Sequence, residues 1–147
     1  MNSDIEDKGE FAGWTTWKSE EFEHKTAGPF YFRTDETGPV AAFRAVRKHM
    51  NSGGVVHGGC LMTFADFALF ALAHEALAND SYGLTVAFTS EFLSGAKEGQ
   101  YMEARGDVLR TGRSLVFVRG LITADGDPCL NFSGTLKRGK PLKAEAP

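Results

Sequence analysis

The sequence predicts an α+β domain in which a curved antiparallel sheet wraps around one long buried helix. The segment from Cys60 to Leu77 is rich in strong helix formers and has apolar side chains on every face, so the helix must be covered on all sides. Two strand-like segments precede it and four follow it, and these segments supply the cover. The connections between the later segments are short, which favours antiparallel neighbours.

Length and composition are those of one globular domain. The chain has 147 residues, of which 42% are apolar and 24% charged, and its formal charge of −3 argues against a general nucleic-acid binder. Two cysteines cannot build a disulfide framework, which favours a reduced, cytoplasmic setting. No apolar run is long enough to cross a membrane, and the acidic start is unlike a secretory signal. We therefore expect neither nucleic-acid nor membrane partners.

The first element is an N-terminal extension over residues 1–28. Its first ten residues are polar and acidic, as in a frayed tail. In Phe11–Phe22, Trp14 and Trp17 are three residues apart, which suits one face of a short helix that docks on the body. A main domain over residues 29–138 follows, and residues 139–147 form a polar tail.

The strands of the main domain follow from alternation and turn signals. Two are expected to pair as a hairpin before the helix, over 29–33 and 40–48, around a turn at 35–39. The four later strands are expected over 84–93, 100–109, 114–123 and 128–137, with Asp125-Gly126 as a hairpin turn. A six-stranded sheet of this kind leaves exposed edges, which predicts pairing with a second copy as a homodimer.

The loop before the helix is the first candidate site. Asn51, His57, Gly58 and Gly59 lie where the helix begins, and a helix N-terminus offers free N–H groups to a phosphate or an oxyanion. The two glycines are equally compatible with a tight turn alone, and Asn51 with a turn residue. His57 either donates to a substrate or caps the helix.

Asp66 is the stronger candidate because it interrupts the apolar helix. No basic residue lies three or four positions away, so the carboxylate meets a distant partner, a subunit interface or a wet pocket. A structural carboxylate bonded to backbone amides is the alternative. Thr85, in an apolar strand, could orient a water or serve only as a good strand former. Cys60, in the first helical turn, is either a nucleophile acidified by the helix dipole and His57 or a packed, inert thiol.

Cofactor motifs are missing from the sequence. The four histidines are scattered, no Cys-x-x-Cys pair occurs, and neither a dinucleotide-binding nor a phosphate-loop pattern is present, so no metal and no cofactor is expected. Arg110 and Arg113 could contact phosphates at a pocket mouth, or they could be solvated surface residues.

These residues together resemble the hotdog-fold acyl-CoA thioesterases, with the phenylacetate-pathway (PaaI-like) branch as the nearest. The resemblance rests on Asn51-x5-His57-Gly58-Gly59, on Phe64-Ala65-Asp66 in the helix and on Leu84-Thr85-Val86, and it spans about residues 29–138. It implies an acyl-CoA substrate, and active sites at the interface of a homodimer or of a dimer of dimers.

The resemblance also implies a role for each residue. Asp66 would be the general base or nucleophile, and the N–H of Gly58 would polarise the thioester carbonyl. His57 and Asn51 would orient the substrate or the attacking water, and Thr85 would help to place that water. Asp66 and Thr85 would come from one subunit and the His-Gly-Gly loop from its partner.

Substrate contacts are expected at Gly59, Phe67, Arg110 and Arg113. The many phenylalanines around the helix favour an aryl or medium-chain acyl group, or they simply fill the core. Three other functions remain open: a non-catalytic acyl-CoA sensor on the same fold, an enoyl-thioester hydratase, for which no Asp-His hydration motif is found, and a purely structural or interaction protein.

Overall fold

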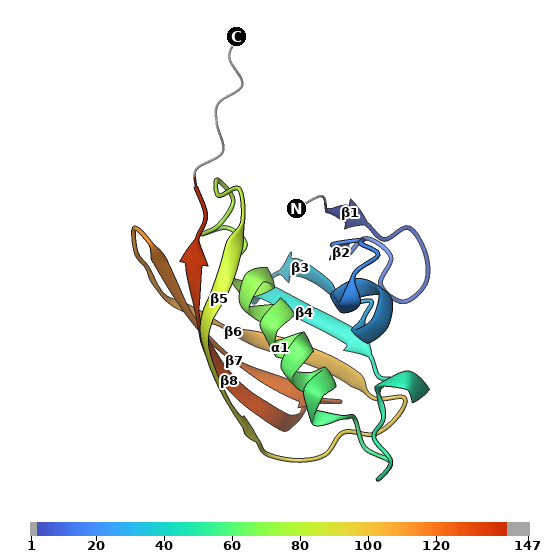
Figure 1. The fold of residues 1–147 in the computed structure, drawn as a ribbon. Helices are drawn as coiled ribbons and strands as arrows, with labels where there is room; N and C mark the ends of the chain where they lie inside the picture. The colour runs from blue at the N-terminus through green and yellow to red at the C-terminus, as the bar shows by residue number, and fades with distance from the viewer. Residues whose placement is uncertain (1–2, 141–147) are drawn as a thin grey trace.

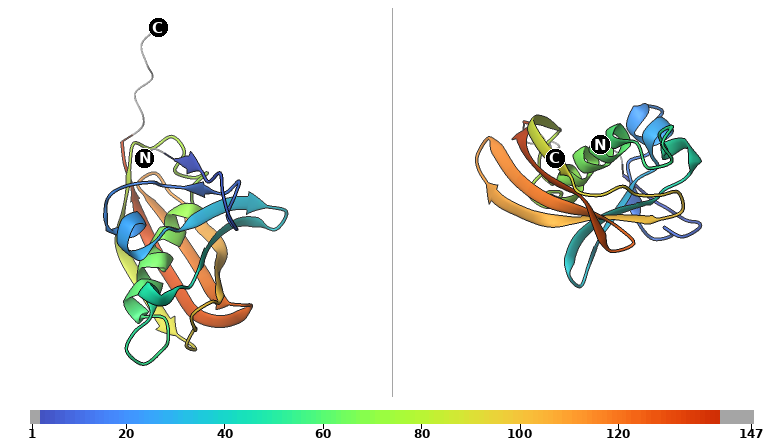
Figure 2. Two further views of the ribbon diagram at one scale, coloured as in Figure 1. Left: turned by 90° about the vertical axis from the view of Figure 1, so that its right-hand side faces the viewer. Right: turned by 90° about the horizontal axis from the view of Figure 1, so that it is seen from below.

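The computed structural model describes residues 3–140, which form a single antiparallel sheet curled around one α-helix (Figure 1). The sheet order is β1-β2-β3-β4-β6-β7-β8-β5. Seen from below, the sheet curves around the helix (Figure 2). The expected α+β class and hotdog arrangement are confirmed. The elements are β1 (Asp4–Ile5), β2 (Thr15–Thr16), the π-helix η1 (Phe22–Ala27), β3 (Tyr31–Asp35), β4 (Gly38–Arg44), the 3-10 helix η2 (Arg47–His49), α1 (Gly58–Leu72), β5 (Gly83–Phe92), β6 (Tyr101–Thr111), β7 (Leu115–Ala124) and β8 (Asp127–Arg138).

Helix α1 is the centre of the core. Its buried residues pack against the inward side chains of β4, β6, β7 and β8. Phe30, Phe43, Phe64 and Phe67 form an aromatic cluster with ring centroids 4.7–6.4 Å apart. The helix ends at Leu72, five residues before the expected Leu77. After Ala73 the residues up to Asp80 are exposed or half-buried, and helix propensity without burial is marginal in water.

The later strands confirm the expected segments to within one or two residues at each end. On β6, Met102 and Ala104 are fully buried and alternate with half-buried charged neighbours. Asp125 and Gly126 both have positive φ, as a two-residue turn between β7 and β8 requires. The first hairpin, β3–β4, is also confirmed, although β4 ends at Arg44 and η2 follows instead of a strand reaching residue 48.

The expectation that consecutive late strands are neighbours is wrong for β5. Strand β5 pairs with β8, whereas β6 pairs with β4 and β7. The connection over residues 93–100 can span about 26 Å when extended, while three strand spacings are only about 14 Å. A connection that looks short in sequence is therefore long enough to cross the sheet, and β5 becomes an edge strand.

The helix expected around Trp14 and Trp17 is also wrong. This stretch is extended at β2, so side chains three residues apart point to opposite faces of the sheet. Trp14 packs with Phe11, Tyr31 and neighbours on the outer face, whereas Trp17 contacts Phe32 and Phe67 on the helix side. The short helix of the N-terminal extension is instead η1, which packs on α1.

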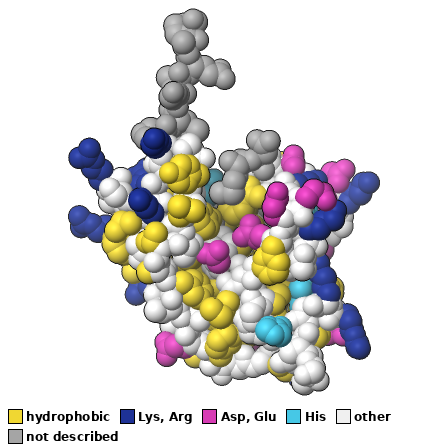
Figure 3. All heavy atoms as spheres, in the orientation of Figure 1, with side chains coloured by type: hydrophobic (Ala, Val, Ile, Leu, Met, Phe, Trp, Pro, Cys, Tyr) yellow, Lys and Arg dark blue, Asp and Glu magenta, His cyan; other side chains and the backbone are white. Residues whose placement is uncertain are grey.

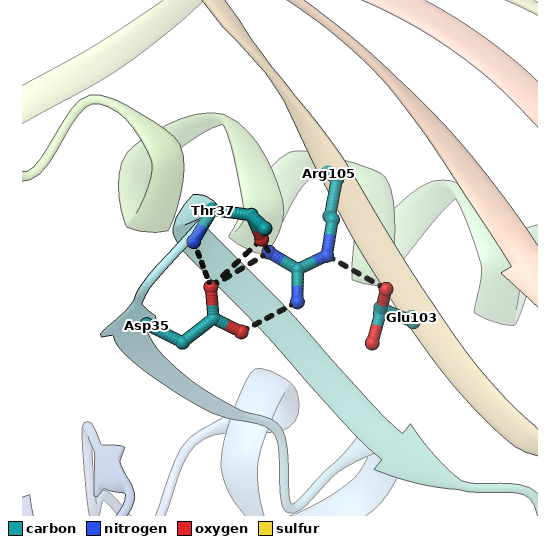
Figure 4. A network of polar contacts seen from close by, with 4 residues as sticks. All are labelled: Asp35, Thr37, Glu103 and Arg105. Carbon is teal, nitrogen blue, oxygen red and sulfur yellow. Dashed lines mark hydrogen bonds and ion pairs between the residues drawn. The ribbon is translucent and has the colours of Figure 1, made fainter.

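A polar network on the outer face ties the β3–β4 turn to β6 (Figure 4). The Arg105 guanidinium donates to both carboxylate oxygens of Asp35 at 3.1 and 2.6 Å, to Thr37 at 2.6 Å and to Glu103 at 2.8 Å. These hydrogen bonds hold the pKa of Asp35 well below its ordinary value. The network therefore joins the β3–β4 turn to β6 on the face of the sheet that α1 does not cover.

Within residues 3–140, no helix is both long and apolar enough to span a membrane. The polar tail expected over residues 139–147 falls mostly outside the described residues, which reach only Lys140.

Candidate active site

Asp66 meets Thr85 where α1 faces β5. The Thr85 hydroxyl donates to Asp66 Oδ1 at 2.6 Å, and both side chains are half-buried. A half-buried carboxylate therefore has a neutral hydroxyl donor and no ion-pair partner among residues 3–140, so it keeps lone pairs free to accept a proton. Among the described residues, no backbone N–H donates to the Asp66 carboxylate, so its contacts do not match the alternative of a structural carboxylate bonded to backbone amides.

A second carboxylate, Glu23, approaches from the N-terminal extension. It lies in η1 beside Trp17, Phe30 and Phe67. Burial, with the nearby Asp66 carboxylate as the second cause, raises the pKa of Glu23 from 4.5 to about 7. Sequence reasoning missed this residue because a charged run usually marks a solvated surface, and only the packing of η1 on α1 buries it.

The start of α1 presents a free backbone donor. His57 is the N-cap, and its Nδ1 accepts from the Gly59 N–H at 2.8 Å, while its side chain is exposed. His57 thus caps the helix. The Gly58 N–H has no hydrogen-bond partner among the described residues, so the first orphan donor of the helix is available to a ligand oxygen.

Space at Gly58 is limited by the end of β5. A Cβ added at Gly58 would lie 3.1 Å from Cε1 of the Phe92 ring. The helix start and the last residue of β5 are therefore neighbours, just as Asp66 and Thr85 are neighbours nearer the other end of the same strand.

Asn51 shapes the loop that leads to the helix. Its Oδ1 accepts from the N–H groups of Gly53 at 2.8 Å and Val55 at 3.2 Å, in the manner of an Asx turn. The loop is anchored where the N–H of His57 donates to the His49 carbonyl at 2.8 Å. Asn51 thus orders the loop, and its amide nitrogen makes no hydrogen bond to any of residues 3–140.

The structure separates the expected substrate contacts. Gly59 is exposed at the helix start, and Arg110 and Arg113 are exposed near the β6–β7 turn, at the opposite end of the molecule. Phe67 is only 2% exposed and packs on Trp17 and its aromatic neighbours. The core therefore covers the Phe67 ring in this structure, and a direct contact with a substrate stays a prediction.

The thiol of Cys60 is not an activated nucleophile. Burial raises its pKa from 9.0 to about 11, so the protonated form dominates at neutral pH. Between Ser3 and Lys140, no three His, Cys, Asp or Glu side chains converge where they could hold a metal ion. The residues that remain for chemistry are a carboxylate with its hydroxyl partner and a backbone N–H at a helix start.

Comparisons with known proteins identify the family. The family model of the thioesterase superfamily matches residues 53–130. A Pseudomonas aeruginosa protein named as an esterase is 35% identical over 92 residues, which are 61% of this chain and 68% of that protein. A thioesterase structure from Streptococcus pneumoniae, solved with coenzyme A, matches with a TM-score of 0.71 at 19% identity, over 83% of this chain and 95% of its own. The Escherichia coli PaaI structure matches with a TM-score of 0.69 at 21% identity, over 83% and 87%. The chain belongs to the thioesterase superfamily.

Proposed function

We propose that this protein hydrolyses acyl-CoA thioesters to the free acid and CoA. The observation that carries the proposal is the pairing of Asp66 with Thr85 on a helix whose start offers the unpartnered Gly58 N–H. The coenzyme A bound to the similar Streptococcus pneumoniae structure agrees with a CoA ester as the substrate.

In the proposed reaction Asp66 acts as general base. It takes a proton from a water molecule, the water oxygen bonds to the thioester carbonyl carbon, and the negative charge develops on the carbonyl oxygen. A backbone N–H at a helix start stabilises that oxyanion. Collapse of the tetrahedral intermediate breaks the carbon–sulfur bond, and CoA leaves as a thiolate that takes up a proton. Thr85 keeps the Asp66 carboxylate oriented throughout.

One chain cannot bring both groups to the same thioester. Gly58 and Asp66 are eight residues apart, which is about 12 Å along the helix axis. The Gly58 N–H points away from Asp66, because the N–H groups of a helix point toward its N-terminus, so an accepting oxygen would lie about 3 Å farther out. We therefore propose that the two groups come from different chains.

Strand β5 offers the means for two chains to meet. Within the described residues it pairs only with β8, so its other edge is free. Leu84, Val86 and Phe92 on this strand are each about 55% exposed. Figure 3 shows hydrophobic side chains gathered along the β5 side, with Lys and Arg side chains at its margin. We propose a homodimer through this edge, as a dimer or within a dimer of dimers.

Antiparallel pairing of two β5 strands would complete the site. Thr85 lies near the start of β5 beside Asp66, and Phe92 lies at its end beside Gly58. Such pairing sets the start of one strand against the end of the other. Asp66 of one copy then faces Gly58 of the second copy, with His57 and Asn51 of that second copy near the substrate.

Release of free thiol from a panel of acyl-CoAs tests the proposal, with wild type beside Asp66→Asn. We expect wild type to hydrolyse some members and Asp66→Asn to lose most turnover while remaining folded and dimeric. Equal rates for the two proteins would contradict the role of Asp66. Binding without hydrolysis by wild type would favour a sensor on the same fold. Given its free thiols at Cys60 and Cys129, we expect a cytoplasmic enzyme.

A further inference from the structure

The ring of His49 is buried where the N-terminal extension meets the loop that leads to α1. His49 is only 4% exposed and is the last residue of η2. Its Nδ1 lies 3.0 Å from the backbone nitrogen of Val46, and its Nε2 lies 2.8 Å from the carbonyl oxygen of Ala27. Because a backbone N–H can only donate, Nδ1 must accept, and the ring carries its proton on Nε2, which donates to Ala27. The two contacts therefore fix one neutral tautomer, and burial, which lowers the pKa of His49, favours the same form.

The backbone of His49 extends this anchor to the start of α1. Its carbonyl accepts from the His57 N–H at 2.8 Å, and the next residues inward, Met50 and Val56, form an isolated antiparallel bridge. The chain between them is therefore a narrow loop that His49 closes at its base. His57, on the other side of the base, is the N-cap of α1, and Gly58 follows it directly. The N–H proposed for the oxyanion thus lies one residue from a hydrogen bond that His49 accepts.

At its other end the anchor holds the last turn of η1. The His49 ring donates to the carbonyl of Ala27, the last residue of η1, and the Lys48 ammonium donates to the carbonyl of Gly28, the next residue. Carbonyl groups at the end of a helix have no partner within it, so these two side chains supply the missing donors. The N-terminal extension is therefore joined to the start of α1 by the ring and the backbone of a single residue.

A buried histidine can also be merely structural, and the fold offers a matched comparison. The Thr16 side chain is also buried, and its hydroxyl donates to the Phe30 carbonyl at 2.8 Å. This bond likewise joins the N-terminal extension to the main domain, but Phe30 leads into β3 and not to the start of α1. Loss of either contact should lower stability, whereas only loss of the His49 contacts should displace Gly58.

We propose that His49 is a positioning residue for the oxyanion donor: its ring, held at both nitrogens, fixes the base of the loop so that the Gly58 N–H meets the thioester carbonyl. The inference rests on the proposed function and adds a residue to the site. His49 acts through Gly58, since its own ring is buried and both of its nitrogens have partners. Its loss should therefore weaken stabilisation of the transition state more than binding of the substrate, so that kcat falls and KM changes little.

Thiol release by His49→Phe and Thr16→Val tests the proposal. Phenylalanine keeps a ring against Phe43, whose centroid is 5.0 Å from that of His49, but it can make neither hydrogen bond. We expect kcat of His49→Phe to fall about 10- to 100-fold, as a small misplacement of an active-site group implies, and KM to change less than about twofold. Thr16→Val should keep the kcat of wild type, and melting curves establish that both variants are folded. Equal losses of kcat in the two variants would overturn the positioning role.

A double-mutant cycle identifies the group through which His49 acts. Gly58→Pro removes the N–H at a helical position that tolerates proline. If His49 acts through that N–H, adding His49→Phe to Gly58→Pro should lower kcat by less than about threefold more. Losses of kcat that multiply in the double variant would overturn the assignment of Gly58 as the group that His49 positions.

Hydrogen exchange tests the inference without catalysis. The His57 N–H is protected by its bond to the His49 carbonyl, so it should exchange about tenfold faster or more in His49→Phe and at the wild-type rate in Thr16→Val. Wild-type exchange of this N–H in His49→Phe would overturn the inference and leave the thioesterase activity standing. No hydrolysis by wild type would overturn the proposed function, and faster exchange in His49→Phe would then still support the hold of His49 on the helix start.

Discussion

Replacing Gly58 by proline removes the proposed oxyanion donor and little else. Gly58 is the first residue of α1, a position where proline is favoured because its missing N–H has no helical partner. The preceding residue, His57, has ψ 132°, which lies in the extended region that a following proline requires. Gly58→Ala is the matched control, since it adds the same Cβ against the exposed Phe92 ring but keeps the N–H.

The expected magnitude follows from the loss of one hydrogen-bond donor to a developing oxyanion. Such a loss costs about 10²–10³-fold in kcat. We expect Gly58→Pro to fall by that factor relative to Gly58→Ala in the thiol-release assay, with melting temperatures within about 2 °C of each other because neither variant loses a native hydrogen bond. Rates for the two variants within threefold of each other would refute the role of this N–H.

Co-expression with Asp66→Asn extends the test to the shared site. In a mixed dimer of Gly58→Pro and Asp66→Asn chains, one site carries both defects and the other carries neither. Random pairing makes half of the dimers mixed, so about a quarter of the wild-type activity should return. If both groups served a substrate within one chain, no activity would return, and the two-chain geometry would be wrong.

Three further predictions concern single side chains. Thr85→Val removes the donor to Asp66 while keeping the shape of the side chain, so kcat/KM should fall about tenfold or more, and Thr85→Ser should recover most of the loss; unchanged kinetics would contradict a positioning role. The raised pKa of Glu23 contributes stability that is present below pH 4.5 and is lost as the pH rises through about 7. The melting temperature of wild type should therefore fall relative to that of Glu23→Gln between pH 4.5 and pH 8. A difference in melting temperature that stays constant over this range would contradict the prediction. With its pKa raised to about 11, Cys60 should react slowly with iodoacetamide at pH 7.5, and Cys60→Ser should keep its activity. Rapid labelling of Cys60 that abolishes turnover would indicate that this thiol is the nucleophile.

The helix and its carboxylate could be predicted because the physics that decides them is local. A segment that is apolar on every face must be buried, and a lone Asp66 within it must meet a partner from elsewhere. The partner, Thr85, was a candidate on weaker grounds, since a threonine in a strand is ordinary. Hydrogen bonding between them depends on β5 lying beside α1, which the pattern of strands did not specify.

The errors arose where long-range packing decides the outcome. The spacing of Trp14 and Trp17 fits a helix, but pairing with β3 makes the segment extended and sends the two rings to opposite faces. Burial of Glu23 depends on η1 resting against α1, which no local pattern reveals. The edge position of β5 depends on a connection that crosses two strands, β8 and β7, and turn signals carry no information about that crossing.

The edge position of β5 has a consequence for how the protein responds to dilution. Leu84, Val86 and Phe92 on this strand are each about 55% exposed in one chain, and the proposed dimer covers them. The Asp66–Thr85 hydrogen bond lies within one chain and is kept when two chains separate. Turnover in the proposed site needs both chains, so dissociation would silence the enzyme while each chain stays folded.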